Sequence, residues 1–145
     1  MKTAAKQAVC INREAEKRPV SQRNLKALIV EDFETMQKAV AKILASLNIE
    51  SFIAANGIEA LKILDKESVD IVFSDLVMPE MDGFELCEEI RRRPDTRQLP
   101  IIVISTHRDA HYVVRALRCG ADDYLTKPFT AGLAEQIIER VTSNV

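Results

Sequence analysis

The sequence contains few cysteines and no long apolar run. Cys10, Cys87 and Cys119 are widely spaced and never form a C-x-x-C pair. This spacing argues for reduced thiols and against a disulfide framework or a zinc site. No apolar stretch approaches the roughly 18 residues that a membrane span requires. Residues 1–20 also lack the apolar core of a signal peptide, so we expect a cytoplasmic protein that does not enter a membrane.

The chain also lacks internal repeats and low-complexity tracts. Its 145 residues suit one domain with a sizeable core. An apolar fraction of 47% and a charged fraction of 29% are ordinary for a globular protein. Composition therefore indicates a single globular domain and selects no chemistry.

Charge is distributed unevenly along the chain. Residues 1–26 carry seven basic and two acidic side chains, a net charge of +5, so the remainder carries −7. A basic arm suits nucleic acid or an acidic partner, but a solvated leader is the simpler interpretation. We expect residues 1–24 to form a basic leader or linker that is helical in part, residues 25–142 the domain, and residues 143–145 a tail.

From residue 25 onward, short apolar runs alternate with segments of helical periodicity. The runs that predict strands covered on both faces are residues 25–30, 51–55, 70–75, 100–105 and 123–127. The segments with an apolar stripe at helical spacing are residues 33–47, 57–66, 83–93, 109–118 and 131–142. Thr130 is a candidate N-cap and Gly120 a candidate helix stop. Five strands alternating with five helices predict an α/β domain with a parallel sheet.

Polar residues fall where these strands end. Glu31 and Asp32 follow the first strand, Asp75 ends the third, Ser105 ends the fourth and Lys127 ends the fifth. Because parallel sheets bind ligands beyond the carboxyl ends of their strands, we expect these side chains to converge. Close carboxylates repel one another, and a hard cation such as Mg²⁺ would relieve that repulsion.

Each of these residues has an ordinary explanation when it is taken alone. An aspartate after a strand is usually a helix cap or a loop residue, and a single lysine is usually a surface residue. Their joint occurrence at four strand ends favours a site instead. A lysine, a hydroxyl and clustered acids suit the transfer of a phosphoryl group to a carboxylate, where catalysis is mostly positioning and charge neutralisation.

Four stretches resemble the receiver domain of bacterial two-component response regulators. They are LIVEDFETMQKAVAKIL, DIVFSDLVMPEMDGFEL, LPIIVIST and GADDYLTKPF, and the first is especially similar to the chemotaxis regulator. The resemblance covers about residues 25–142. It implies a flavodoxin-like, doubly wound fold with a five-stranded parallel sheet in the order 2-1-3-4-5 and five helices.

The resemblance also implies a role for each matching acid. Asp75 is the expected phosphoacceptor, which takes a phosphoryl group from the phosphohistidine of a sensor histidine kinase or a phosphotransfer protein. Asp32, Asp75 and the backbone carbonyl of Val77 are the expected Mg²⁺ ligands. Glu31 is expected to act on the cation directly or through water.

Three further residues receive roles from the same resemblance. Lys127 is expected to contact Asp75 and then a phosphoryl oxygen, and the bond from Lys127 to Pro128 is expected to be cis. Ser105 is the expected switch hydroxyl, which moves toward the phosphoryl group. Tyr124 is the expected switch aromatic, which swings inward behind it.

The implied output is contact with a downstream effector protein, which the sequence does not identify. We expect no direct nucleic-acid binding by this domain, and if a homodimer forms we expect it to use residues 109–142. The sequence shows no output domain after residue 142, so the chain is either a stand-alone receiver or a piece of a longer protein.

Two other functions compete with this signalling switch, which is not a turnover enzyme. A Mg²⁺-dependent phosphatase with an aspartyl nucleophile usually carries a second aspartate two residues later, where this chain has Val77. A docking module without phosphorylation would not need the intact set of polar residues. Val77 and His107 stand where the family tunes dephosphorylation, and an apolar Val77 predicts a long-lived acyl phosphate. His107 is otherwise expected to be an isolated surface histidine.

Overall fold

The computed structural model describes residues 18–142, so residues 1–17, with the helix expected there, and residues 143–145 lie outside the described part. No helix within residues 18–142 combines the length and apolar character needed to cross a bilayer. The elements are η1 (Val20–Gln22), β1 (Lys26–Val30), α3 (Glu34–Ser46), β2 (Glu50–Ala54), α4 (Gly57–Lys66), β3 (Ile71–Ser74), α5 (Gly83–Arg92), β4 (Ile101–Ser105), α6 (Ala110–Arg118), β5 (Asp123–Thr126) and α7 (Ala131–Thr142).

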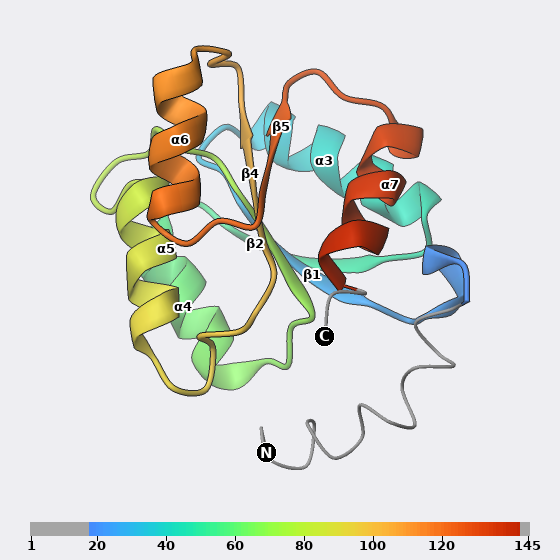
Figure 1. Ribbon diagram of the computed structural model, residues 1–145. Coiled ribbons are helices and arrows are strands. Elements are labelled where there is room, and N and C mark those ends of the chain that lie inside the picture. Colours follow the sequence, from blue (N-terminus) through green and yellow to red (C-terminus); the bar gives the residue numbers. More distant parts are fainter. Residues whose placement is uncertain (1–17, 143–145) are drawn as a thin grey trace.

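The strands form one parallel sheet in the order β2-β1-β3-β4-β5. The predicted flavodoxin-like order is therefore confirmed. Helices α4, α5 and α6 cover one face of the sheet, and α3 and α7 cover the other (Figure 1). The strand order reverses between β1 and β3, which places a crevice at the carboxyl ends of these two strands.

Two apolar cores lie on the two faces of the sheet. Leu28 and Val30 of β1 belong to the core beneath α4, α5 and α6. Ile29 belongs to the core beneath α3 and α7. Alternation of side chains along a strand sends neighbours to opposite faces, so continuous apolar runs are needed where both faces are covered.

Local caps fix where several helices begin and end. Asn56 accepts a hydrogen bond from the backbone N–H of Glu59 at the start of α4, and Asp82 forms a capping box at the start of α5. Thr130 Oγ1 accepts from the N–H of Leu133, 3.1 Å away, as predicted for the N-cap of α7. Gly120 follows α6 with φ of 116°, which is the left-handed stop that its position predicted.

Four apolar residues within the segments predicted to carry apolar helical stripes are exposed. Phe33 is 71% exposed, and Ile58, Leu117 and Leu133 also lie at the surface. Phe33 precedes α3 in extended conformation as its N-cap residue, so it does not follow the helical stripe. The edge strand β2 was also expected to be covered on both faces, but its Ile53 is exposed.

Residues 18–24, which belong to the segment predicted to be a leader or linker, pack against the domain. Val20 is buried in the core beneath α3 and α7. Arg23 Nη1 donates to Thr142 Oγ1 of α7 at 3.0 Å, and Asn48 Nδ2 donates to the carbonyl of Ser21 at 2.9 Å. The division of the chain at residue 24 stays a prediction.

Candidate functional site

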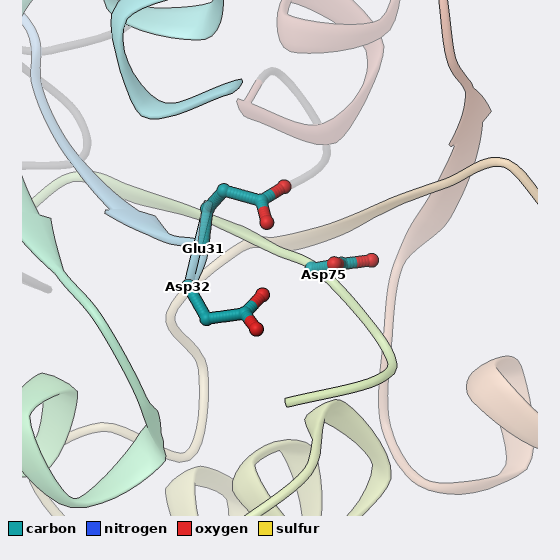
Figure 2. Close-up of side chains that lie close together, drawn as sticks. All are labelled: Glu31, Asp32 and Asp75. Carbon is teal, nitrogen blue, oxygen red and sulfur yellow. The ribbon is translucent and has the colours of Figure 1, made fainter. Parts of the chain in front are cut away.

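Three carboxylates meet beyond the ends of β1 and β3. Val30 pairs with Ser74 in the sheet, and the backbone N–H of Asp75 donates to the carbonyl of Val30 at 2.9 Å. This register brings Asp75 beside Glu31 and Asp32, which directly follow β1. One oxygen of each carboxylate lies within 4.8 Å of the others, and Figure 2 shows the three side chains reaching toward one side of the site.

The three carboxylates differ in burial and in their partners. Glu31 is fully buried, Asp75 is half-buried and Asp32 is exposed. Glu31 Oε1 accepts a hydrogen bond from Lys127 Nζ at 2.6 Å, and Glu31 Oε2 accepts from the N–H of Phe33 at 3.2 Å. Both oxygens of Glu31 therefore already have donors, whereas the carboxylate of Asp32 faces solvent.

Lys127 reaches the site from the loop after β5, and its side chain is only 6% exposed. Its ammonium lies 3.7 Å from Asp75 Oδ2, which is farther than its 2.6 Å bond to Glu31. The resemblance predicted a contact with Asp75, and the structure adds a closer ion pair with Glu31. The bond from Lys127 to Pro128 is cis, as expected.

Burial governs the electrostatics of Glu31. Desolvation raises the pKa of its carboxyl above the ordinary value of 4.5, the hydrogen bond from Lys127 lowers it, and the negative charge of Asp75 raises it again. The carboxylate of Glu31 is thus held in an environment that resists its ionisation. One ammonium serves three acids, so negative charge remains in excess.

The donor set fits a hard divalent cation. Only oxygen ligands converge here, and carboxylates with water are the usual ligands of Mg²⁺. Asp32 is exposed and Asp75 is half-buried, so these are the two acids that such an ion can reach; Asp75 Oδ1 also accepts a hydrogen bond from the N–H of Leu76 at 2.8 Å. Because both oxygens of Glu31 are hydrogen-bonded, that residue is better placed to act through water.

Gly83 holds the loop after β3 against the site. A Cβ at this position would lie 2.2 Å from the backbone oxygen of Asp75 and 2.9 Å from the Cα of Leu76. The N–H of Gly83 donates to the carbonyl of Leu76 at 2.8 Å. Glycine is therefore needed for close approach, while Glu80 in the same loop takes the left-handed conformation, with φ of 69°.

The side chains of the two predicted switch residues both form hydrogen bonds with the backbone of His107. Ser105 is buried, and its Oγ accepts a hydrogen bond from the N–H of His107 at 3.1 Å. The hydroxyl of Tyr124 donates to the carbonyl of the same His107 at 2.8 Å. Burial raises the pKa of Tyr124, and the neighbouring Ser105 hydroxyl lowers it.

His107 was expected to be an isolated surface histidine, and that expectation was wrong. His107 is half-buried, and its imidazole stacks on the ring of Tyr112 with centroids 4.2 Å apart. The available signal for this stack was that two aromatic rings stand five positions apart, one in a loop and one at the start of the next helix. The sequence did not show that this loop folds back on itself.

Comparison with known proteins agrees with this geometry. The family model of the response regulator receiver domain matches residues 27–141. A chemotaxis protein, CheY-3 of Vibrio cholerae, is 32% identical over 120 residues, which are 82% of this chain and 92% of that protein. A probable transcriptional regulator, ycf27 of Cyanidium caldarium, is 36% identical over 81% of this chain, which spans only 46% of that protein.

Solved structures give the same result. The signal receiver domain of a histidine kinase from Syntrophus aciditrophicus has a TM-score of 0.75 and 38% identity, covering 83% of this chain and 91% of that one. The receiver domain of sensor histidine kinase PA1611 from Pseudomonas aeruginosa, solved with a magnesium ion coordinated in its active site cleft, has a TM-score of 0.77 and 28% identity, covering 83% and 99%. The chain therefore belongs to the response regulator receiver domains, which are phosphorylation-dependent signalling domains.

Proposed function

We propose that Asp75 accepts a phosphoryl group from the phosphohistidine of a sensor histidine kinase or a phosphotransfer protein. The observation that carries this proposal is the contrast in access between the acids around Lys127. The Asp75 side chain is 15% exposed and 3.7 Å from the ammonium, whereas the Glu31 side chain is 1% exposed and fully hydrogen-bonded. Asp75 is thus the acid that combines a cationic neighbour with access for a partner.

The chemistry is a transfer between two nucleophiles. A carboxylate oxygen of Asp75 attacks phosphorus, the P–N bond of the phosphohistidine breaks, and its electron pair returns to the imidazole nitrogen. The product is an acyl phosphate on Asp75. The ammonium of Lys127 neutralises charge on a phosphoryl oxygen, which is the main form of catalysis available to such a transfer.

Asp32, Asp75 and the backbone carbonyl of Val77 would hold Mg²⁺, with Glu31 acting through water. The cation would supply charge neutralisation for the incoming phosphoryl oxygens. The donor set described above supports this assignment, as does the magnesium ion in the cleft of the similar PA1611 receiver domain. The buried ion pair of Lys127 with Glu31 would lie beside this cation.

The phosphorylated state would be relayed through Ser105 and Tyr124. The Ser105 hydroxyl donates to a phosphoryl oxygen, and Tyr124 follows through the hydrogen bonds that join both residues to His107. The output surface we propose is residues 109–142, which would contact an effector protein or a second copy of this chain in the cytoplasm. We propose no direct contact with nucleic acid or membrane.

The domain would act as a switch and not as a turnover enzyme. An aspartyl phosphatase needs an acid near the leaving group, and Val77 occupies the position two residues after Asp75. The Val77 side chain is 62% exposed and apolar, so it offers no group to orient a hydrolytic water. The acyl phosphate should therefore persist for longer than seconds.

Incubation with acetyl phosphate and Mg²⁺ followed by intact mass tests the proposal. We expect one added phosphoryl group on the wild type and on Asp109→Asn, an exposed aspartate at the same edge of the domain. We expect none on Asp75→Asn. Equal labelling of Asp75→Asn would overturn the assignment, and omission of Mg²⁺ should abolish labelling of every variant.

A further inference from the structure

The backbone of His107 joins the two switch side chains. Residues 106–109 connect β4 to α6, and of these only His107 is half-buried while the others are exposed. The N–H of His107 donates to Ser105 Oγ, and its carbonyl accepts from the Tyr124 hydroxyl. The backbones of Ser105 and Tyr124 are held by the paired strands β4 and β5, and the backbone of His107 helps to orient their two hydroxyls.

The side chain of His107 is held by a ring stack. Its imidazole lies on the ring of Tyr112 with centroids 4.2 Å apart and planes 20° apart. Tyr112 is in the first turn of α6 and packs against the core beneath α4, α5 and α6. The imidazole of His111 contacts the same ring at 4.3 Å but lies at the surface.

Helix α6 itself has a small buried surface. Ala116 is its one fully buried residue, while Val114 and Leu117 are exposed. The guanidinium of Arg115 lies 3.9 Å from the centroid of the Phe84 ring in α5, which gives a second anchor. A helix with so little buried area depends strongly on individual ring contacts, so the stack of Tyr112 matters for both α6 and the loop.

We infer that Tyr112 is a positioning residue for the phosphorylation switch. Its ring holds the imidazole of His107, and the His107 backbone in turn holds the Ser105 and Tyr124 hydroxyls. The hydroxyl of Ser105 has one hydrogen and two lone pairs. With one lone pair occupied by the N–H of His107, its orientation toward an incoming oxyanion is restricted before phosphorylation occurs.

The ring stack and the hydrogen bonds of His107 are independent of the proposed function. Only the expected effect of Tyr112 on phosphorylation rests on that function. Loss of an aromatic stack lowers the equilibrium constant for ordering the loop by roughly 2- to 10-fold. The rate of phosphorylation by acetyl phosphate should fall by no more than that factor, because Ser105 must then be ordered during the reaction. The helix α6 and its exposed residues would also lose their fixed relation to Asp75.

The chain offers a direct readout because it contains two tyrosines, Tyr112 and Tyr124. Protein labelled with 3-fluorotyrosine should give two ¹⁹F resonances, and Tyr112→Phe should leave only that of Tyr124. We expect Tyr112→Phe to keep the wild-type shift of Tyr124 and the wild-type phosphorylation rate. We expect Tyr112→Leu to move the Tyr124 resonance toward its unfolded position and to slow phosphorylation.

The histidines provide matched controls. His107→Ala removes the stacking ring and should reproduce the effect of Tyr112→Leu, whereas His111→Ala should leave the Tyr124 resonance unchanged. An unchanged Tyr124 resonance in both Tyr112→Leu and His107→Ala would overturn the inference. If no variant is phosphorylated, the proposed function fails, but the ¹⁹F comparison still decides the role of Tyr112. If Tyr112→Leu does not fold, His107→Ala gives the same test.

Discussion

The ion pair between Glu31 and Lys127 predicts an asymmetric response to mutation. Both side chains are almost completely buried, and the 2.6 Å bond between them sits beside the partly exposed Asp75. Lys127→Met leaves Glu31 buried without its cation and next to another acid. Glu31→Gln leaves Lys127 with an amide oxygen to donate to and with Asp75 3.7 Å away as a counter-charge.

The magnitudes follow from what each variant leaves behind. An unpaired buried charge costs about 3–5 kcal/mol, so we expect Lys127→Met to lower the free energy of unfolding by that amount at pH 7. The raised pKa of Glu31 shows that its ionisation is already resisted in the fold. Glu31→Gln removes that cost, but its single amide oxygen cannot accept from both Lys127 and the N–H of Phe33, so we expect a loss of about 1–3 kcal/mol, smaller than that of Lys127→Met.

The pH dependence has a defined sign. A carboxyl whose pKa is raised by folding adds stability below its unfolded value of 4.5, and this contribution is lost as pH rises through the folded pKa. Wild-type stability should therefore fall relative to Glu31→Gln as pH increases above 4.5. Lys127→Met should show a steeper fall over a wider range, because Glu31 then ionises without a cation.

Urea unfolding followed by circular dichroism, in EDTA and at several pH values, measures all of these quantities. The double variant Glu31→Gln with Lys127→Met should be more stable than Lys127→Met alone, since the unpaired carboxylate is gone. Equal losses for the two single variants would contradict the proposed electrostatics. A Lys127→Met variant whose stability does not depend on pH would do so as well.

Three further predictions concern packing, metal binding and thiol chemistry. Gly83→Ala should cost at least about 1–3 kcal/mol in urea unfolding because its Cβ would overlap the Asp75 carbonyl at 2.2 Å. Gly132→Ala, where the nearest atom is 3.9 Å away, should be neutral or stabilising by up to about 1 kcal/mol, and a comparable loss in both would contradict this packing. Magnesium chloride at 100-fold over its Kd should raise wild-type stability by about 2.7 kcal/mol, and the increase should shrink in Asp32→Ala when both are measured by thermal unfolding. Burial raises the pKa of Cys87 to about 12, so iodoacetamide at pH 8 should label it only after denaturation, and rapid labelling of the native protein in peptide maps would show that the thiol is accessible.

The arrangement of elements could be predicted from the sequence because periodicity and breakers agree along the domain. The run from Asp70 to Asp75 is mostly apolar between two acids, and the structure makes its centre a fully buried strand. Thr130 and Gly120 marked helix ends through local hydrogen bonding and backbone conformation, which depend only on neighbouring residues. Such local signals can be read from the sequence without knowledge of tertiary contacts.

The exposure of side chains was predicted less well, because it depends on which other elements pack against each side chain. Phe33 has the right spacing for the stripe of α3, yet it precedes the first helical turn and projects into solvent. Val20 lies in a segment that resembles a linker, yet it fills space beneath α3 and α7. Neither outcome follows from periodicity, since both are set by where the chain enters and leaves an element.

The candidate site shows the same division between local and non-local information. Parallel strands place their carboxyl ends together, so the convergence of Asp32, Asp75 and Lys127 at one edge could be anticipated. The pairing of Lys127 with Glu31 could not, because it depends on the length and path of the lysine side chain under the sheet edge. His107 was missed for a similar reason, since its contacts are made by its backbone and by a ring five residues away.

The observed pairing changes how the crowding of acids should be understood. The sequence indicated three carboxylates that together required a cation and a lysine. In the structure the ammonium of Lys127 bonds first to the buried Glu31, so those two charges largely cancel within the protein. The uncompensated charge is then that of Asp32 and Asp75, which one divalent cation would balance. Glu31 and Lys127 thus form a buried, charge-balanced pair at the base of the site, and under the proposed function the two more accessible aspartates are the part of it that a cation and a phosphoryl group would reach.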